Sequence, residues 1–318
     1  MRILFWGTPE FATPPLRALI GEGFDVVGVV TQPDRPRGRS RSQLEASPVK
    51  QVAMEEGVPV LQPERPRGPD FVHSMRDLAP DLSVVVAYGH ILPKEVIDLP
   101  RLGTLNIHAS LLPRLRGAAP IEAAIAQGFS ETGVTIMRMV SALDAGPVLH
   151  VLTTSIEPDE TGGELRLRLS ELGATALIEA LALMELGEAR EQPQDDAQAT
   201  YAHKLARENA FVDWTQPAEI VARRMRAYDP KPGAWGVLSS AEVRLYGARA
   251  IADRAGVAGE VLEAGDIGLV VACGAGAVAI REVHPAGKRR MEAREWTQGQ
   301  RALTGARFRT GITDLDNG

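Results

Sequence analysis

Residues 2–31, RILFWGTPEFATPPLRALIGEGFDVVGVVT, contain two apolar runs on either side of an amphipathic segment. The runs at 2–6 and 26–31 do not alternate polar with apolar side chains, which is typical of strands covered on both faces of a parallel sheet. The segment between them begins with prolines and ends at glycines, the usual boundaries of a helix. This stretch therefore predicts a strand–helix–strand unit.

The same alternation continues through the first half of the chain. Further strands are predicted at 58–61, 82–87, 103–108 and 133–139. Further helices are predicted at 49–56, 70–79, 120–128 and 163–186. Repeated alternation of strands and helices predicts an α/β domain with a doubly wound, mostly parallel, Rossmann-like sheet.

The pattern changes after residue 186. Residues 187–207 begin with a polar stretch without periodicity, and we expect a linker there. Beyond it the sequence predicts one helix at 217–228 and short, glycine-separated strands at 235–238, 242–249, 259–263, 267–273 and 276–283. We therefore expect a first domain at 1–186 and, at 208–318, a small OB-like β-barrel.

Length and composition limit the classes of function. A chain of 318 residues fits two domains, and its 44% hydrophobic and 24% charged residues exclude wholesale disorder. The single cysteine, Cys273, excludes an internal disulfide framework and a cysteine-rich zinc site. No apolar run reaches the ~20 residues that a bilayer requires, and the short run before Gly7 does not fit a secretory signal. We expect a cytoplasmic protein without a membrane partner.

The net charge of −6 is unevenly distributed along the chain. Residues 1–204 carry a net charge of −8 and residues 205–318 carry +2. An acidic chain argues against a nucleic-acid partner, whereas halves of opposite sign suggest divided roles. Ordinary variation between two domains explains the difference equally well.

Common nucleotide and hydrolase motifs are missing from the sequence. A dinucleotide fingerprint requires three glycines spaced G-x-G-x-x-G, and only Gly7 stands in the first turn. There is no Walker loop, His-Glu-x-x-His zinc motif or Gly-x-Ser-x-Gly elbow. The first turn is therefore not expected to bind NAD or FAD.

A polar trio suggests acyl transfer to an amine. Asn106 and His108 lie two residues apart at the end of a predicted strand, so both face the edge where open α/β sheets bind ligands. Asp144 follows the strand at 133–139 and could reach His108. A histidine can accept a proton, a carboxylate can orient it, and an asparagine amide can donate to an oxyanion. Considered singly, a structural histidine and a turn aspartate are the commoner interpretations.

The set Asn106-x-His108, residues 110–113 (SLLP) and Asp144 within Leu-Asp-Ala-Gly resembles the formyltransferases that use 10-formyltetrahydrofolate. Further stretches resemble the branch of that family that acts on methionyl-tRNA, at residues 7–12, 31–36, 47–50, 85–89, 116–121, 131–137, 212–214 and 285–288. The likeness covers most of the chain.

The resemblance implies transfer of a formyl group from 10-formyltetrahydrofolate to the α-amino group of methionyl-initiator tRNA, for translation initiation and without a metal. Asn106, His108 and Asp144 would be the catalytic residues, and the chain would act as a monomer. The residues expected at the folate are Ala87, Tyr88, Gly89, Ile91, Leu92, Ser110, Leu111, Leu112 and Pro113.

The resemblance also implies that the C-terminal barrel and the loop at 35–42 contact the tRNA. This loop contains four arginines among Gly, Pro and Ser, a composition suited to the phosphates and exposed bases of an acceptor stem. It departs from the family pattern, because Ser40 to Gln43 stand where lysine pairs are frequent and the loop is one residue longer. The expected tRNA contacts are Arg35, Arg37, Arg39, Arg41, Lys288, Arg289 and Arg290, with a second basic cluster at Arg223, Arg224 and Arg226. A solvated charged surface is the alternative for each cluster.

Rival functions share part of this pattern. Related enzymes formylate small amines, either glycinamide ribonucleotide or a UDP-amino sugar, but the first normally lacks a C-terminal barrel and the second does not need an arginine-rich loop. A non-enzymatic alternative is an RNA-binding protein with a degenerate formyltransferase domain. The intact Asn106, His108 and Asp144 argue against it.

Overall fold

The computed structural model describes residues 1–37, 43–298 and 303–311, which form two compact units. The first unit comprises Met1–Gly117, Glu131–Ser155 and Arg166–Ala202. The second comprises Ala118–Ser130, Ile156–Leu165 and the described part of His203–Gly318. The predicted domain boundaries, 1–186, 187–207 and 208–318, concern where independently folding domains end, and they stay a prediction.

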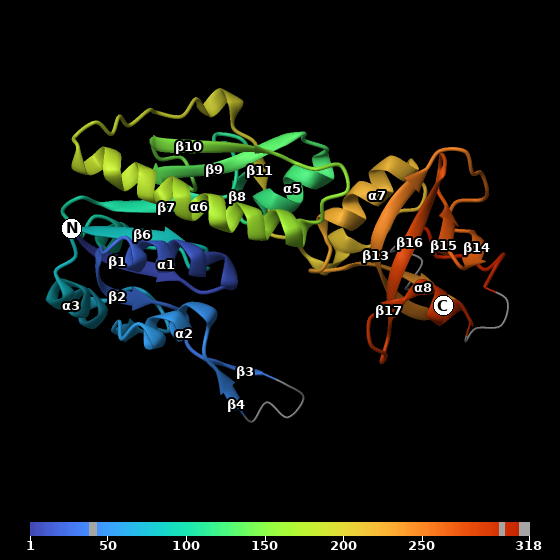
Figure 1. Cartoon of the computed structure of the whole chain (residues 1–318), viewed down its shortest axis with the longest axis horizontal. Coiled ribbons are helices and arrows are strands. Elements are labelled where there is room, and N and C mark those ends of the chain that lie inside the picture. Colours follow the sequence, from blue (N-terminus) through green and yellow to red (C-terminus); the bar gives the residue numbers. More distant parts are fainter. Residues whose placement is uncertain (38–42, 299–302, 312–318) are drawn as a thin grey trace. The chain divides into compact units, whose positions relative to one another are not determined.

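The first unit is an α/β structure (Figure 1). Its strands are β1 (Arg2–Gly7), β2 (Asp25–Val30), β3 (Arg35–Arg37), β4 (Gln43–Glu45), β5 (Val60–Leu61), β6 (Leu82–Val86), β7 (Thr104–His108), β8 (Arg116–Gly117), β9 (Glu131–Arg138), β10 (Val148–Ser155) and β11 (Tyr201–Ala202). Its helices are α1 (Thr13–Gly21), α2 (Pro48–Glu55), α3 (Pro69–Leu78), α4 (Lys94–Ile97) and most of α6 (Gly162–Glu185).

The main sheet of this unit has the strand order β10-β9-β7-β6-β1-β2-β5. The pairs from β7 to β5 are parallel, whereas β9 pairs antiparallel with both β7 and β10. The predicted doubly wound, mostly parallel sheet is therefore confirmed. The strand order reverses between β1 and β6, and ligands of such folds bind beside this reversal at the carboxyl ends of the strands.

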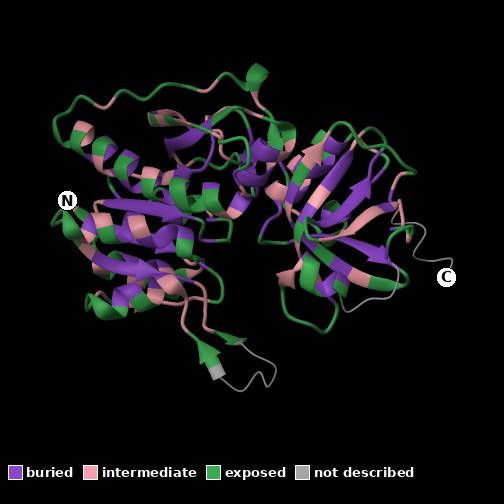
Figure 2. Ribbon diagram, turned by 45° about the vertical axis from the view of Figure 1, so that its right-hand side comes forward, coloured by how far each residue is buried: buried purple, intermediate pink, exposed green. Residues whose placement is uncertain are grey.

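The central strands β1, β2, β6 and β7 are buried on both faces, which explains their unbroken apolar sequences (Figure 2). Leu4 and Trp6 share one apolar cluster with residues of α3 and α4. At Gly173 of α6, a Cβ would lie 3.1 Å from Ile107 Cγ2, so α6 lies directly on β7. Neither α6 nor any other helix in the described part of the chain is long and apolar enough to cross a membrane.

Strand β10 was not predicted from the sequence. It extends the sheet beyond β9 and pairs only with that strand within the main sheet. From His150 onward its residues alternate between intermediate and exposed, as expected of an edge strand with one face in water.

The second unit contains the antiparallel sheet predicted for the C-terminal half. Its strands are β12 (Ala234–Leu238), β13 (Ala241–Ile251), β14 (Val261–Gly265), β15 (Gly268–Ala272), β16 (Ala277–Pro285) and β17 (Met291–Glu292), and its helices are α5 (Pro120–Gln127), α7 (Ala218–Ala227) and α8 (Ala293–Gln298). The strand order is β12-β13-β16-β15-β14, with β17 beside β16. All neighbouring pairs are antiparallel, so this element of the fold is confirmed.

The two edges of this sheet are joined by an extended segment near residue 308. Phe308 pairs with Leu238 at the end of β12, and Arg307 pairs with Glu260 just before β14. The Phe308 N–H also donates to the carbonyl of Gly259 at 2.8 Å. Because one segment bonds to both edges, the sheet closes into the barrel that the sequence predicted, without exposed edges there.

Substitution of Phe308 tests this closure. The Phe308 ring is 1% exposed and its centroid lies 5.2 Å from that of Trp214. Phe308→Ala should lower the free energy of unfolding of the second unit by about 3–5 kcal/mol, because a large apolar cavity remains. Denaturant unfolding measures this effect. The exposed Ile267→Ala serves as the control, and equal stability of the two variants would contradict the closure.

Candidate active site

Two polar side chains lie at the carboxyl end of β7. In the sheet register, Asn106 is opposite Val85 of β6 and Met137 of β9, and His108 is opposite Thr135. Since the two residues are two positions apart in one strand, they face the same side of the sheet. His108 is buried, with 5% of its surface exposed, whereas Asn106 is partly exposed.

The imidazole of His108 contacts a carbonyl on one side and a carboxylate on the other. Its Nε2 lies 3.0 Å from the Leu115 carbonyl oxygen, which can only accept, so Nε2 carries a proton. Its Nδ1 lies 3.7 Å from Asp144 Oδ2, too far for a hydrogen bond. Nδ1 is therefore the nitrogen with a free lone pair, and it faces the Asp144 carboxylate.

The loop that carries Asp144 depends on close backbone approaches. Asp144 has a left-handed φ of 48°, and its Oδ2 accepts the Gly117 N–H at 2.8 Å. At Gly146, a Cβ would lie 1.8 Å from the Arg138 carbonyl oxygen. No side chain fits at that position, which explains the glycine of the Leu-Asp-Ala-Gly motif.

Residues 110–113 follow shortly after β7. Their backbone is bonded to Thr135, which was not among the predicted site residues. Thr135 of β9 donates its hydroxyl to the Ser110 carbonyl at 2.7 Å and accepts the Leu112 N–H at 3.2 Å. Ser110 is buried, and its hydroxyl donates to the Arg114 carbonyl at 2.6 Å. Leu111, Leu112 and Pro113 are partly exposed. A threonine inside a strand carries no motif, so only the structure identifies this contact.

The loop after β6 exposes some of its predicted folate residues and buries others. Ala87 and Gly89 have positive φ values of 48° and 90°, which turn the chain sharply at the sheet edge. Ile91 is 90% exposed, whereas Leu92 is only 4% exposed and belongs to the apolar core. An exposed apolar side chain at this edge can cover a flat heterocycle.

Tyr88 anchors that loop through its side chain. The ring is 1% exposed and its centroid lies 5.3 Å from that of Trp6, and burial raises the pKa of the phenol to about 12. The Tyr88 carbonyl accepts hydrogen bonds from Gln32 Nε2 at 2.9 Å and from the Thr8 hydroxyl at 3.2 Å. The side chain therefore belongs to the core, and the loop's backbone links it to neighbouring strand ends.

The arginine-rich loop begins and ends as a small hairpin. β3 (Arg35–Arg37) pairs antiparallel with β4, and the exposed Arg35 donates to the Gln32 side chain. Arg39 and Arg41 lie outside the described residues.

The base of this hairpin is fixed by a polar cluster. Lys50 Nζ lies 2.6 Å from Asp34 Oδ2 and 2.8 Å from Gln62 Oε1, and Gln62 Nε2 donates to Asp34 Oδ1 at 2.7 Å. The hydrogen bonds from Lys50 and Gln62 lower the pKa of Asp34 below its usual value. Beside the cluster lies a cleft of about 430 Å³, whose lining includes Thr8, Glu10, Gln32, Arg35, Ser47 and Gln51.

The basic residues at 288–290 have different environments. Lys288 and Arg289 are exposed. Arg290 pairs with Glu282 and, at 3.2 Å, with Asp229, and its guanidinium lies 4.0 Å from the centre of the Tyr246 ring. Partial burial opposes its charge, but the two carboxylates raise the pKa of Arg290 above its usual value.

Arg226 of the second basic cluster is partly buried. Its pKa is lowered by desolvation, although the charge of Asp159 opposes the shift. Arg224 donates to the Asn209 carbonyl at 3.2 Å. These contacts lie within the second unit and limit how freely either side chain can move to a ligand.

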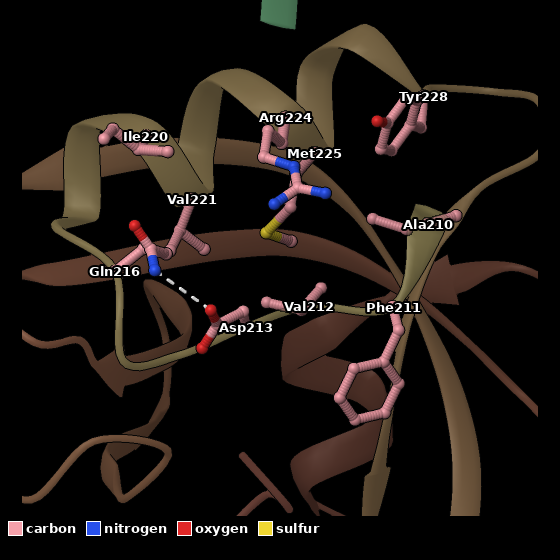
Figure 3. A pocket seen from close by; sticks show the side chains of 11 residues that line it. Ala210, Phe211, Val212, Asp213, Gln216, Ile220, Val221, Arg224, Met225 and Tyr228 are labelled. Atoms are coloured by element: carbon pink, nitrogen blue, oxygen red, sulfur yellow. Dashed lines mark hydrogen bonds between the residues drawn. The ribbon is translucent and has the colours of Figure 1, made fainter. Parts of the chain in front are cut away.

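The family-like stretch 212–214 makes structural contacts at the start of α7. Asp213 accepts hydrogen bonds from the Thr215 N–H and from Gln216 Nε2, each at 3.0 Å, and leads into α7 (Figure 3). Partial burial raises the pKa of Asp213, but these hydrogen bonds outweigh it and the net shift is downward. The adjoining cleft has a volume of only about 10 Å³, too small for an organic ligand.

Both halves of the chain match families of known proteins. Residues 1–181 match the family model described as Formyl transferase, and residues 204–301 match Formyl transferase, C-terminal domain. The chain is 47% identical to the Methionyl-tRNA formyltransferase of Geotalea daltonii, covering 97% of this chain and 98% of that protein. It is 49% identical to the Methionyl-tRNA formyltransferase of Pseudomonas fluorescens, with coverages of 91% and 90%.

Solved structures of lower identity share the fold. Methionyl-tRNA formyltransferase from Clostridium thermocellum matches with a TM-score of 0.57 at 14% identity, covering 79% of this chain and 92% of that one. HypX from Aquifex aeolicus in complex with tetrahydrofolic acid matches with a TM-score of 0.64 at 24% identity, covering 93% and 46%. WlaRD, a sugar 3N-formyl transferase, matches with a TM-score of 0.66 at 14% identity, covering 91% and 98%.

Substitution of Gly146 tests whether the Asp144 loop depends on close packing. Gly146→Ala should lower the free energy of unfolding by about 1–3 kcal/mol, because the new methyl group overlaps the Arg138 carbonyl. Gly21→Ala is the matched control, since a Cβ there meets no atom within 4 Å. Thermal unfolding compares the variants, and an unchanged Gly146→Ala protein would contradict the close approach.

Proposed function

We propose that this chain transfers a formyl group from 10-formyltetrahydrofolate to the α-amino group of methionyl-initiator tRNA. The chain belongs to the formyl transferase family and, within it, to the methionyl-tRNA formyltransferases. The observation that carries the proposal is the 47% identity over 97% of the chain to a relative of that name. The reaction would supply formylmethionyl-tRNA for translation initiation.

His108 would manage the proton that the amine loses. Because Nε2 already donates to the Leu115 carbonyl, Nδ1 is the atom available as a base. The carboxylate of Asp144, 3.7 Å away, would stabilise the resulting imidazolium. Asp144 therefore need not take up the proton itself.

Asn106 would act on the carbonyl oxygen of the formyl group. Its amide shares a strand face with His108, and it is partly exposed rather than sealed in the core. A fixed N–H donor stabilises negative charge that develops on a carbonyl oxygen during attack by an amine. The new bond would join the amine nitrogen to the formyl carbon as the bond from that carbon to the donor's nitrogen breaks. The proton taken from the amine would pass from His108 to that nitrogen, and tetrahydrofolate would leave.

The loop 87–92 and residues 110–113 would hold 10-formyltetrahydrofolate, which supplies the activated formyl group. The exposed Ile91 fits the apolar face of the heterocycle, while the buried Tyr88 would fix the loop. These segments follow β6 and β7, neighbouring strands of the sheet, so they lie at the same edge as Asn106 and His108.

The tRNA would contact basic residues of both units. Among the expected contact residues that the structure describes, Arg35, Lys288, Arg289 and Arg290 are all exposed, but Arg290 is also paired with two carboxylates. We therefore propose that Arg290 supports its neighbours and that Lys288 and Arg289 contact phosphates. We also propose that the protein acts in the cytoplasm as a monomer.

A competition assay distinguishes this function from its rivals. The protein is supplied with 10-formyltetrahydrofolate and offered methionyl-initiator tRNA beside glycinamide ribonucleotide and a UDP-amino sugar. Formylation of the tRNA alone is expected. Preferential formylation of either small amine would replace the proposal, and tRNA binding without any formylation would favour the RNA-binding alternative.

Substitution of His108 tests the proton-handling role. His108→Ala should reduce kcat/KM for methionyl-tRNA by about 10²–10⁴, the usual contribution of a positioned general base. His73→Ala is the control, because the His73 side chain is 75% exposed and pairs only with Asp77 on the surface. Wild-type turnover by His108→Ala would refute the assignment.

Salt dependence tests the proposed phosphate contacts. In the Lys288→Ala/Arg289→Ala double variant, the slope of log affinity for tRNA against log salt should become shallower by about 1–2, because fewer counterions are released. Filter binding across a range of KCl concentrations measures the slope. Arg254→Ala, which removes an exposed arginine paired with Glu263, is the charge control. An unchanged slope in the double variant would exclude both residues from the footprint.

A further inference from the structure

Gln194 lies in the polar stretch after α6 and contacts the loop that carries Asp144. Its Nε2 donates to the Asp144 carbonyl at 2.8 Å and to the Gly146 carbonyl at 2.7 Å. Both amide N–H groups of the side chain are thereby used. The two accepting carbonyls flank Ala145, so one side chain fixes the turn on both sides.

The other end of the Gln194 amide is held equally firmly. Its Oε1 accepts from Arg116 Nε at 3.1 Å and from Arg116 Nη2 at 2.8 Å. Arg116 is 3% exposed and also pairs with Asp196 at 2.7 Å. A buried arginine that is bonded through both Nε and Nη2 provides a rigid support for the amide.

The backbone beside this contact is paired as well. β8 (Arg116–Gly117) and β11 (Tyr201–Ala202) form a short parallel ladder, and the Arg116 N–H donates to the Thr200 carbonyl at 2.9 Å. The Gly117 N–H in turn donates to Asp144 Oδ2. Asp144 is therefore held at its carboxylate by Gly117 and at its carbonyl by Gln194.

These contacts stabilise a backbone conformation that is unfavourable by itself. Asp144 has a φ of 48°, in the left-handed region that is less favourable for a residue with a side chain than for glycine. Loss of the two Gln194 hydrogen bonds would free the loop to relax and carry the carboxylate away from His108 Nδ1. A displacement of about 1 Å at a reacting group lowers rates by up to about 10².

We propose that Gln194 is a positioning residue, which holds the Asp144 carboxylate beside His108 while Arg116 supports its amide. The inference rests on the proposed function in one respect, because it takes Asp144 to assist His108 in formyl transfer. Gln194 itself touches no substrate in this account, so its loss should affect turnover rather than tRNA binding.

Two substitutions of Gln194 distinguish a role in positioning Asp144 from a role only in the stability of the protein. Gln194→Ala should lower kcat by about 10- to 100-fold and leave the KM for methionyl-tRNA within about twofold. Gln194→Glu retains an acceptor for Arg116 but cannot donate to the two carbonyls, so it should fold normally and lose kcat to a similar extent. Full activity of Gln194→Glu would overturn the proposal, because the Arg116 contact alone would then suffice.

A double-mutant cycle with Asp144→Asn shows whether Gln194 acts through Asp144. If it does, adding Gln194→Ala to Asp144→Asn should change kcat by less than about twofold. Multiplicative losses of kcat would overturn the proposal. Gln192→Ala is the matched control. This exposed residue of the same stretch pairs with Val148 through its backbone, and alanine retains that pairing.

The same measurements distinguish failure of the inference from failure of the proposed function. If the wild-type protein formylates a small amine instead of methionyl-tRNA, the cycle is measured with that amine. Coupling between Gln194 and Asp144 would then support positioning although the proposed substrate is wrong. Formylation of methionyl-tRNA without such coupling would reject the positioning role and leave the proposed function intact.

Discussion

Strand β1 pairs parallel with β2 on one side and with β6 on the other. This pairing determines where polar side chains of the first unit can lie. The strand order reverses at this point, so the chain leaves the carboxyl ends of β1 and β6 in opposite directions. Because these strands are buried on both faces, polar side chains are costly along their length and gather at their ends. The Tyr88 loop, Asn106 and His108 all lie at this edge.

Formal charge is a poor guide to the partners of this protein, because many charges are used internally. Arg116 is buried and bonded to Gln194 and Asp196, and Arg290 pairs with Glu282 and Asp229. The net charge of −6 therefore counts groups, such as the buried guanidinium of Arg116, that are already bound inside the protein. What matters for nucleic acid is the set of exposed, mobile cations, which the sequence does not separate from the buried ones.

Hydrophobic periodicity predicted the elements that bury a complete face or stripe. The strand at 82–87 and the helix at 163–186 correspond closely to β6 and α6. It failed for β10, whose half-exposed sequence resembles a loop, and for the two-residue strands β8 and β11. Short ladders of this kind form because tertiary packing brings their backbones together, and no local pattern encodes them.

The sequence by itself determined the α/β alternation, the antiparallel second unit and the common face of Asn106 and His108, because each depends on spacing along one element. Only the tertiary structure decided that Asp144 lies 3.7 Å from His108 Nδ1 and that Gln194, fifty positions further on, holds the Asp144 carbonyl. Both contacts depend on loops with special backbone conformations and on pairing between distant segments. Such contacts follow from the packing of the whole unit, because neither side-chain periodicity nor local propensity specifies them.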